Sequence, residues 1–131
     1  MLRLGIRVSS VRSSGRGHLE RCLAVRNHLR EKVYWFVDFK SQFIIDKISG
    51  SDEVFFENGR DRFSFLKRSI KNNNINCVLI DNYEIDSKDI SMLDNCLPVI
   101  TFIDKSIYSK SDIIICTQPI NITRRKGIKY Y

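Results

Sequence analysis

The sequence has no hydrophobic run that approaches the roughly 20 apolar residues of a membrane-spanning helix. Its opening residues, MLRLGIRVSS, lack the long apolar core of a secretory signal and are typical of a buried strand. Only two prolines and six glycines occur among 131 residues, and no segment is of low complexity. A collagen-like repeat and a disordered tail are therefore excluded. We expect one globular domain, which at this length buries roughly two-thirds of the surface of the unfolded chain.

Closely spaced cysteines are also missing. The four cysteines lie far apart, at Cys22, Cys77, Cys96 and Cys116, whereas the ligands of structural zinc sites come in close pairs. Each lies in an apolar run, which predicts buried, reduced thiols and a cytoplasmic protein. No cluster of carboxylates suits a metal ion either, so we expect neither a metal site nor a cofactor.

Negative charge is in short supply. Twenty-two Lys and Arg residues against 15 Asp and Glu residues give a net charge of +7, which favours an anionic partner. Composition does not choose between nucleic acid and a phosphorylated small molecule. Nucleic acid is the weaker choice, because the sequence contains no DNA- or RNA-binding motif and its aromatic residues lie in strand patterns.

Short apolar runs alternate with longer amphipathic stretches along the chain. We expect strands at Leu2–Val8, Val33–Val37, Glu53–Phe56, Cys77–Ile80, Pro98–Ile103 and Asp112–Cys116, and helices at His18–Lys32, Gln42–Ile48, Asp61–Lys71 and Asp86–Asn95. Continuous apolar strands separated by helices favour an α/β fold, a three-layer Rossmann-like domain with a mainly parallel sheet and the first strand at or near its centre. This domain is expected over residues 1–118, followed by a basic, unpatterned tail over residues 119–131.

Ligands of open α/β sheets bind outside the carboxyl ends of the strands. Four of these ends are polar: Ser9–His18, Asp81–Tyr83, Asp104–Lys105 and Thr117–Gln118. In the first, Gly15 and Gly17 precede His18, so the backbone can approach a ligand closely and the free N–H groups of a helix start can attract an anion. The loop is not a dinucleotide fingerprint, which needs glycine where Glu20 stands, and it lacks the GK[ST] of a Walker A loop.

The stretch RVSSVRSSGRGHLERCLAVRNHLRE resembles the N-terminal signature of the UDP-2,4-diacetamido-2,4,6-trideoxy-β-L-altropyranose hydrolase family, close to RADASxxIGxGHxxRCLxLAxxL. Downstream, VLIDNYEID is similar to the family's VVxDxYxxD, VITFIDKSI to its strand ending in an Asp pair, and SDIIICTQPI to its ADxxxNxx strand. The resemblance covers nearly the whole chain in order. The chain departs from the pattern at Ser9 and Val11, which replace Asp and Ser, and at Lys105, which replaces the second Asp of the pair.

The family acts in pseudaminic acid biosynthesis, has relatives in spore-coat polysaccharide synthesis, and resembles glycosyltransferases with the two Rossmann-like domains of the GT-B fold. The resemblance implies the N-terminal half of a GT-B fold and inverting hydrolysis of a UDP-sugar, in which the carbon–oxygen bond at the anomeric carbon breaks. The family's GxGH histidine is the proposed base, which implies that His18 is catalytic. The implied substrate-binding residues are Ser13, Ser14, Gly15, Gly17, Arg21, Tyr83 and Asp104.

Members of this family are more than twice as long, and a C-terminal domain supplies most of their UDP contacts. We therefore expect this chain to be inactive or weakly active alone, either as a fragment of a longer protein or as a half that acts with a separately encoded nucleotide-binding domain. Two alternatives stay open: a GT-B glycosyltransferase half that acts with a partner chain, and a non-enzymatic module that binds anions or nucleic acid. Single residues also have structural interpretations: Arg21 as a surface ion pair, Tyr83 as a loop anchor and Asp81 as a helix cap.

Overall fold

The computed structural model describes residues 1–9, 17–48, 50–59, 61–81, 87–94, 97–103, 113–116 and 129–130. The described strands are β1 (Leu4–Val8), β2 (Val33–Val37), β3 (Glu53–Phe56), β4 (Cys77–Asp81), β5 (Val99–Ile103), β6 (Ile113–Cys116) and β7 (Lys129–Tyr130). The described helices are α1 (Gly17–Arg26), α2 (Gln42–Lys47), α3 (Arg62–Asn72) and α4 (Ser87–Asp94). The strands form one sheet in the order β3-β2-β1-β4-β5-β6-β7, and each neighbouring pair is parallel.

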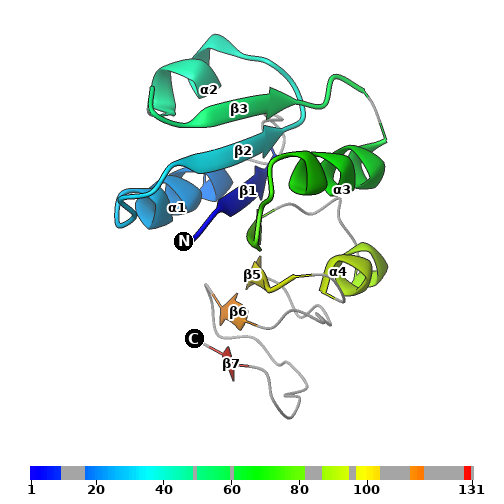
Figure 1. Ribbon diagram of the computed structural model, residues 1–131. Helices are drawn as coiled ribbons and strands as arrows, with labels where there is room; N and C mark the ends of the chain where they lie inside the picture. Colours follow the sequence, from blue (N-terminus) through cyan, green and yellow to red (C-terminus); the bar gives the residue numbers. More distant parts are fainter. Residues whose placement is uncertain are drawn as a thin grey trace.

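Helices cover both faces of this sheet (Figure 1). On one face, alternate residues of the central strands pack against α1 and α2. The buried members of this first cluster are Leu4, Ile6, Val8, Leu19, Cys22, Val33, Trp35, Val37, Ile44, Ile48 and Leu79. On the opposite face the strands pack against α3 and α4. The buried members of this second cluster are Tyr34, Phe36, Leu66, Ile70, Ile75, Val78, Ile80, Ile90, Leu93 and Val99. The predicted three-layer Rossmann-like fold is therefore confirmed.

The central strands read as continuous apolar runs because both of their faces are buried. All five residues of β1 and all five of β2 are buried, and β1 lies between β2 and β4, as predicted for the first strand. Gly5 has its place here, because a Cβ on this residue would lie only 3.0 Å from Phe36 Cε2 and 3.3 Å from Ile75 Cγ2. Glycine thus lets the second cluster pack directly onto the backbone of β1.

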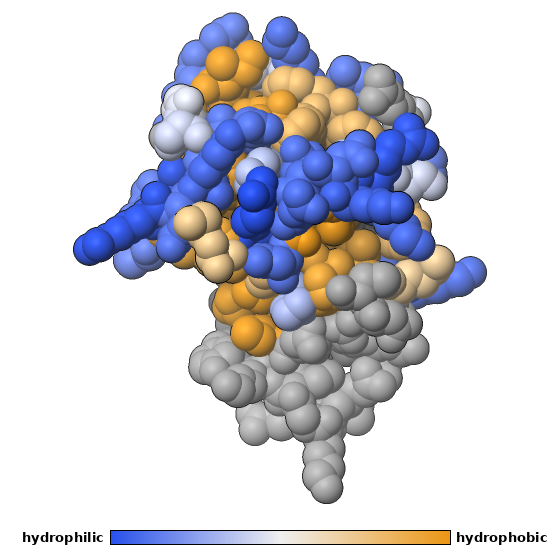
Figure 2. All heavy atoms as spheres, viewed as in Figure 1, coloured by the Kyte–Doolittle hydropathy of each residue, from blue (hydrophilic) through white to orange (hydrophobic). Residues whose placement is uncertain are grey.

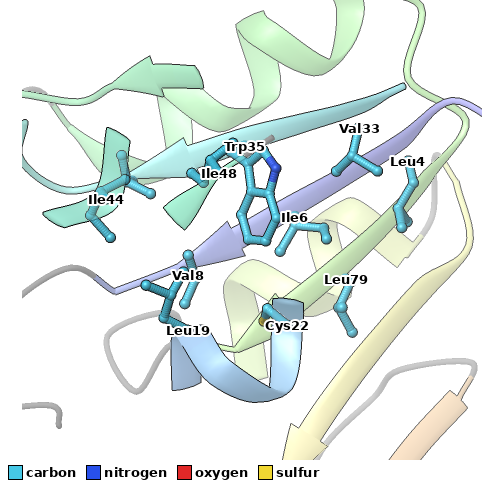
Figure 3. Packing of buried hydrophobic residues seen from close by; sticks show 11 residues of the cluster. Leu4, Ile6, Val8, Leu19, Cys22, Val33, Trp35, Ile44, Ile48 and Leu79 are labelled. Carbon is cyan, nitrogen blue, oxygen red and sulfur yellow. The ribbon is translucent and has the colours of Figure 1, made fainter. Parts of the chain in front are cut away.

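Trp35 links the first cluster to Asp52, the residue before β3. Its side chain lies across the sheet beside Ile6 and Ile48 (Figure 3) and is fully buried. The indole N–H donates to Asp52 Oδ2 at 3.0 Å, and Arg26 Nε donates to the same oxygen at 2.6 Å. Burial raises the pKa of the Asp52 carboxyl, but these bonds and one from the Val33 backbone N–H outweigh burial and hold the pKa below its usual value.

Most element boundaries lie within a residue or two of the predicted ones, but α1 is six residues shorter than expected at its C-terminus. The backbone N–H of His28 donates to Val25 O and that of Leu29 donates to Arg26 O, the tight pattern that ends many helices. Leu29 still packs against the first cluster, so the apolar spacing continues beyond the helix. At the other end of the chain, Lys129–Tyr130 pairs with β6 within the tail, where no element was predicted.

Figure 2 shows a hydrophobic area on one face, over α2 and β3. Two of the exposed large apolar residues belong to this part of the chain: Phe39, which follows β2, and Ile45 of α2. Exposed apolar side chains are normal on folded domains. Among the described residues, no helix has both the length and the apolar character needed to cross a membrane.

Candidate functional site at the switch point of the sheet

The order of the strands places a topological switch point beside β1. From β1 the chain moves outward through β2 to β3, and α3 then returns it to β4 on the other side of β1. Val8 and Asp81, the last residues of β1 and β4, are partners in the parallel register. The carboxyl ends of two such strands are where open α/β sheets bind their ligands. The helix α1, which follows β1 in the chain, begins at Gly17.

His18 occupies the first turn of α1 and is buried, with only 3% of its surface exposed. Its Nδ1 lies 2.5 Å from Asp81 Oδ1. Arg21 also donates to Asp81, so the carboxylate is ionised and can only accept hydrogen bonds. His18 Nδ1 therefore carries the proton and donates. This tautomer puts the lone pair of the imidazole on Nε2, the arrangement by which a carboxylate orients a histidine base.

Arg21 lies one helical turn after His18 and reaches the same carboxylate. Its Nε donates to Asp81 Oδ2, and its Nη2 donates to Oδ1 at 2.5 Å, a two-point contact. Nη2 also lies 3.0 Å from His18 Nδ1, and because both nitrogens carry protons this is a contact between two donors that face one acceptor. The guanidinium lies over the ring of Phe102, a residue of β5, at 5.1 Å from the ring centroid.

Cys22 completes the described surroundings of Asp81. Its thiol donates to Asp81 Oδ2 at 3.8 Å, and the residue is fully buried. Burial, together with the nearby Asp81 charge, raises the pKa of the Cys22 thiol far above its ordinary value. Cys22 is therefore a neutral packing residue, which confirms the buried thiol predicted there. Cys77 is half-buried, and the side chain of Cys116 and all of Cys96 lie outside what the structure describes.

A second group of charges lies on the opposite face of the sheet. Ile6 and Val8 belong to the first cluster, so the side chain between them, Arg7, points to the α3 side. There its Nη2 donates to Asp38 and, at 2.6 Å, to Glu57 Oε2, and its Nη1 donates to Val8 O at 2.8 Å. These three charged residues are at most 2% exposed. We call them the Arg7 cluster.

The Arg7 cluster ties together the carboxyl ends of three strands. Asp38 directly follows β2, Glu57 directly follows β3, and Ser9, which directly follows β1, donates to Asp38 Oδ2 at 2.7 Å. Arg7 Nη1 also donates to Phe36 O at 3.2 Å. The segment that leads from β1 toward α1 therefore starts from an anchored residue.

Three of the predicted site residues fall among the described ones. His18 and Arg21 meet at Asp81, and Gly17 begins α1 with open space where a Cβ would be. Ser13, Ser14, Gly15, Tyr83 and Asp104 lie outside the described residues, so their roles stay predictions.

Two structural interpretations are corrected. Arg21 does pair with a carboxylate, but with one that is 1% exposed instead of one on the helix surface. Asp81 does not act as the cap of the next helix: it is the last residue of β4, α4 begins only at Ser87, and its carboxylate holds His18 and Arg21. The sequence signal for this role was the position of Asp81 at the carboxyl end of an apolar strand. The charged ends of VYWFVD and EVFFE were the corresponding signal for the Arg7 cluster.

The buried carboxylates of Asp38, Glu57 and Asp81 are each engaged by an arginine. The described residues contain no group of three or more His, Cys, Asp or Glu side chains arranged to hold a metal ion. No protein-family model matches this chain, and no curated protein sequence matches it significantly. The geometry of His18, Asp81 and Arg21 is therefore the main guide to function.

Proposed function

We propose that this chain is the N-terminal domain of a UDP-sugar hydrolase-like protein, of GT-B type, that serves the synthesis of surface polysaccharide or nonulosonic acid in the cytoplasm. The observation that carries the proposal is the hydrogen bond between His18 Nδ1 and Asp81 Oδ1 at the switch point of the sheet. The proposal is also supported by the resemblance of the GxGHxxR and DxY motifs to those of the hydrolase family, whose described members His18, Arg21 and Asp81 contact one another.

In the proposed reaction, His18 is the general base. Its Nε2 removes a proton from a water molecule while the water oxygen attacks the anomeric carbon from the face opposite the diphosphate. The bond between the anomeric carbon and the diphosphate oxygen breaks, and its electron pair leaves with UDP, so the configuration inverts. Asp81 stabilises the imidazolium that forms, and His18 then returns its proton to solvent.

The leaving group makes few demands on the protein. Diphosphate leaves readily, so neutralising its charge matters more than a strong general acid. The start of α1 at Gly17 supplies backbone N–H groups and the positive end of the helix dipole, and the absence of a side chain leaves room for close approach. A glycosyltransferase would use the same base on a sugar hydroxyl instead of water, and the products separate the two reactions.

The test combines binding with turnover. UDP-2,4-diacetamido-2,4,6-trideoxy-β-L-altropyranose is added to the wild type, His18→Ala, Asp81→Asn and the control His28→Ala, and UDP release is followed together with the NMR signal of the His18 ring. His28 is exposed, lies two residues beyond the end of α1 and hydrogen-bonds through Nδ1 to Ala24 O, which makes it a matched histidine control.

We expect the sugar nucleotide to move the His18 signal at millimolar concentration, with slow UDP release that falls at least about 100-fold in His18→Ala and is unchanged in His28→Ala. The proposal is wrong if the sugar nucleotide leaves the His18 signal unmoved, or if His18→Ala releases UDP at the wild-type rate. Binding of RNA that moves this signal and weakens steeply with salt would favour the nucleic-acid alternative instead.

A further inference from the structure

We infer that Arg21 is a positioning residue that sets the proton affinity of His18 by competing with it for the single carboxylate of Asp81. The inference rests on the proposed function only in the use it gives the histidine. The competition itself is a property of the contacts among three side chains.

The charges of the group carry the first step. With a neutral imidazole, the Asp81 carboxylate and the Arg21 guanidinium cancel, and a third charge arises only when His18 takes a second proton. His18 is 3% exposed and Asp81 is 1% exposed, so this additional positive charge is separated from water. A group of like charge, Arg21 Nη2, already lies 3.0 Å from Nδ1. Two cations would then share one anion in a poorly solvated place, which disfavours the imidazolium.

Without the guanidinium the balance reverses. An imidazolium beside an ionised Asp81 forms a neutral buried pair, with a charge-assisted hydrogen bond from Nδ1 and without the competition of the Arg21 guanidinium. His18 would then hold its proton more tightly and be a poorer base at neutral pH. Arg21 therefore keeps the ring available to accept a proton, although it need not touch the substrate.

The described contacts of this group come from several elements. From α1, Arg21 and Cys22 contact Asp81, and the raised pKa of the Cys22 thiol keeps it uncharged. From β4 the facing group is Asp81. The charged residue of β1, Arg7, points to the opposite face of the sheet, where it donates hydrogen bonds to Asp38 and Glu57. From β5, Phe102 covers the guanidinium with its ring.

Arg21 also orients the carboxylate. Its Nε and Nη2 contact both oxygens of Asp81, so the plane of the carboxylate is fixed and Oδ1 faces His18 Nδ1. Lysine would restore a positive charge but not this two-point contact. Arg21→Lys therefore separates the effect of charge from the effect of orientation, while Arg21→Met removes both and keeps the length of the side chain.

The experiment is an NMR titration of the histidine ring protons, which needs neither substrate nor activity. The chain has two histidines, so two signals arise, and His28→Gln assigns them. The variants are Arg21→Met, Arg21→Lys and Asp81→Asn. The control is Arg68→Met, which removes one positive charge from an exposed position on α3, the helix on the other face of the sheet. His28 serves as an internal reference in every sample.

We expect Arg21→Met to raise the midpoint of the His18 titration by about one pH unit or more, a roughly tenfold gain in proton affinity. Arg21→Lys should raise it less, and Asp81→Asn should lower it because the guanidinium then remains without its anion. Arg68→Met should leave the His18 midpoint where it is, and all variants should leave that of His28 unchanged. If a hydrolytic rate is measurable, its acid limb should move upward by the same amount in Arg21→Met.

An Arg21→Met midpoint that stays at the wild-type value, or falls, would overturn the inference, and so would an equal shift of the His28 signal. If Arg21→Met does not fold, as judged by the fluorescence of Trp35, the opposed shifts of Arg21→Lys and Asp81→Asn decide the question. Failure to release UDP in the assay above would leave these midpoints untouched, so the two proposals fail separately.

Discussion

Arg7→Met removes the only described cation among two buried carboxylates, and we expect it to destabilise the fold by about 3–5 kcal/mol. Arg7 is 0% exposed, Asp38 is 1% exposed and Glu57 is 2% exposed. Methionine fills much of the volume of the arginine stem, so the loss is mainly electrostatic. It leaves two ionised groups away from water, and it also removes the hydrogen bonds from Nη1 to the backbone oxygens of Val8 and Phe36.

This magnitude is large for a domain of 131 residues, because the total stability of such a domain is about 5–15 kcal/mol. The assay is urea unfolding followed by the fluorescence of Trp35, the only tryptophan, which is fully buried in β2. Arg68→Met, which removes an exposed arginine from α3, is the control and should change the free energy of unfolding by less than about 0.5 kcal/mol.

A compensated variant tests the cause. Arg7→Met combined with Asp38→Asn and Glu57→Gln carries no charge in the cluster, and we expect it to be more stable than Arg7→Met alone by at least about 1 kcal/mol. Two results would refute the reasoning. One is a free energy of unfolding for Arg7→Met that equals the control, and the other is a compensated variant that is no more stable than the single one.

Three further outcomes are expected. Asp52→Asn should lower the free energy of unfolding by about 2 kcal/mol at pH 7, because it weakens the bonds from Arg26 and Trp35. Since the folded pKa of Asp52 is lowered, this difference should shrink as the pH falls below about 4 and through that pKa. A difference in urea unfolding that stays constant across pH would contradict this. Cys22 should resist alkylation in the native protein and react in urea, as peptide mass spectrometry can show, and rapid native labelling would contradict its burial. Gly17→Ala should change the free energy of unfolding by less than about 1 kcal/mol, since a Cβ there meets nothing within 4 Å. The same substitution should weaken sugar-nucleotide binding, and unchanged binding would argue against close approach of the ligand to this backbone.

Part of the candidate site could be predicted from the sequence pattern alone. His18 stood out because a glycine-rich turn and a helix start are visible as local features, and the structure places it at the switch point beside Asp81. Asp81 was visible too, as the polar end of an apolar strand, but its partner was not. Helix capping is a local role that a sequence suggests readily, whereas a contact across 63 positions depends on which strands become neighbours.

The alternation of apolar strands with amphipathic helices by itself predicted the α/β class, the parallel sheet and the central place of β1, because a strand buried on both faces is mostly apolar. Only the tertiary structure decided which charges meet. The parallel register brings Asp81 level with Val8 and carries the ends of β1, β2 and β3 to one edge, so Arg21 and Arg7 each find carboxylates far away in the sequence. The spacing of charged residues along the sequence does not indicate which of them pair. Once they are buried, each charge needs a partner of opposite sign, because a buried charge without one is strongly destabilising.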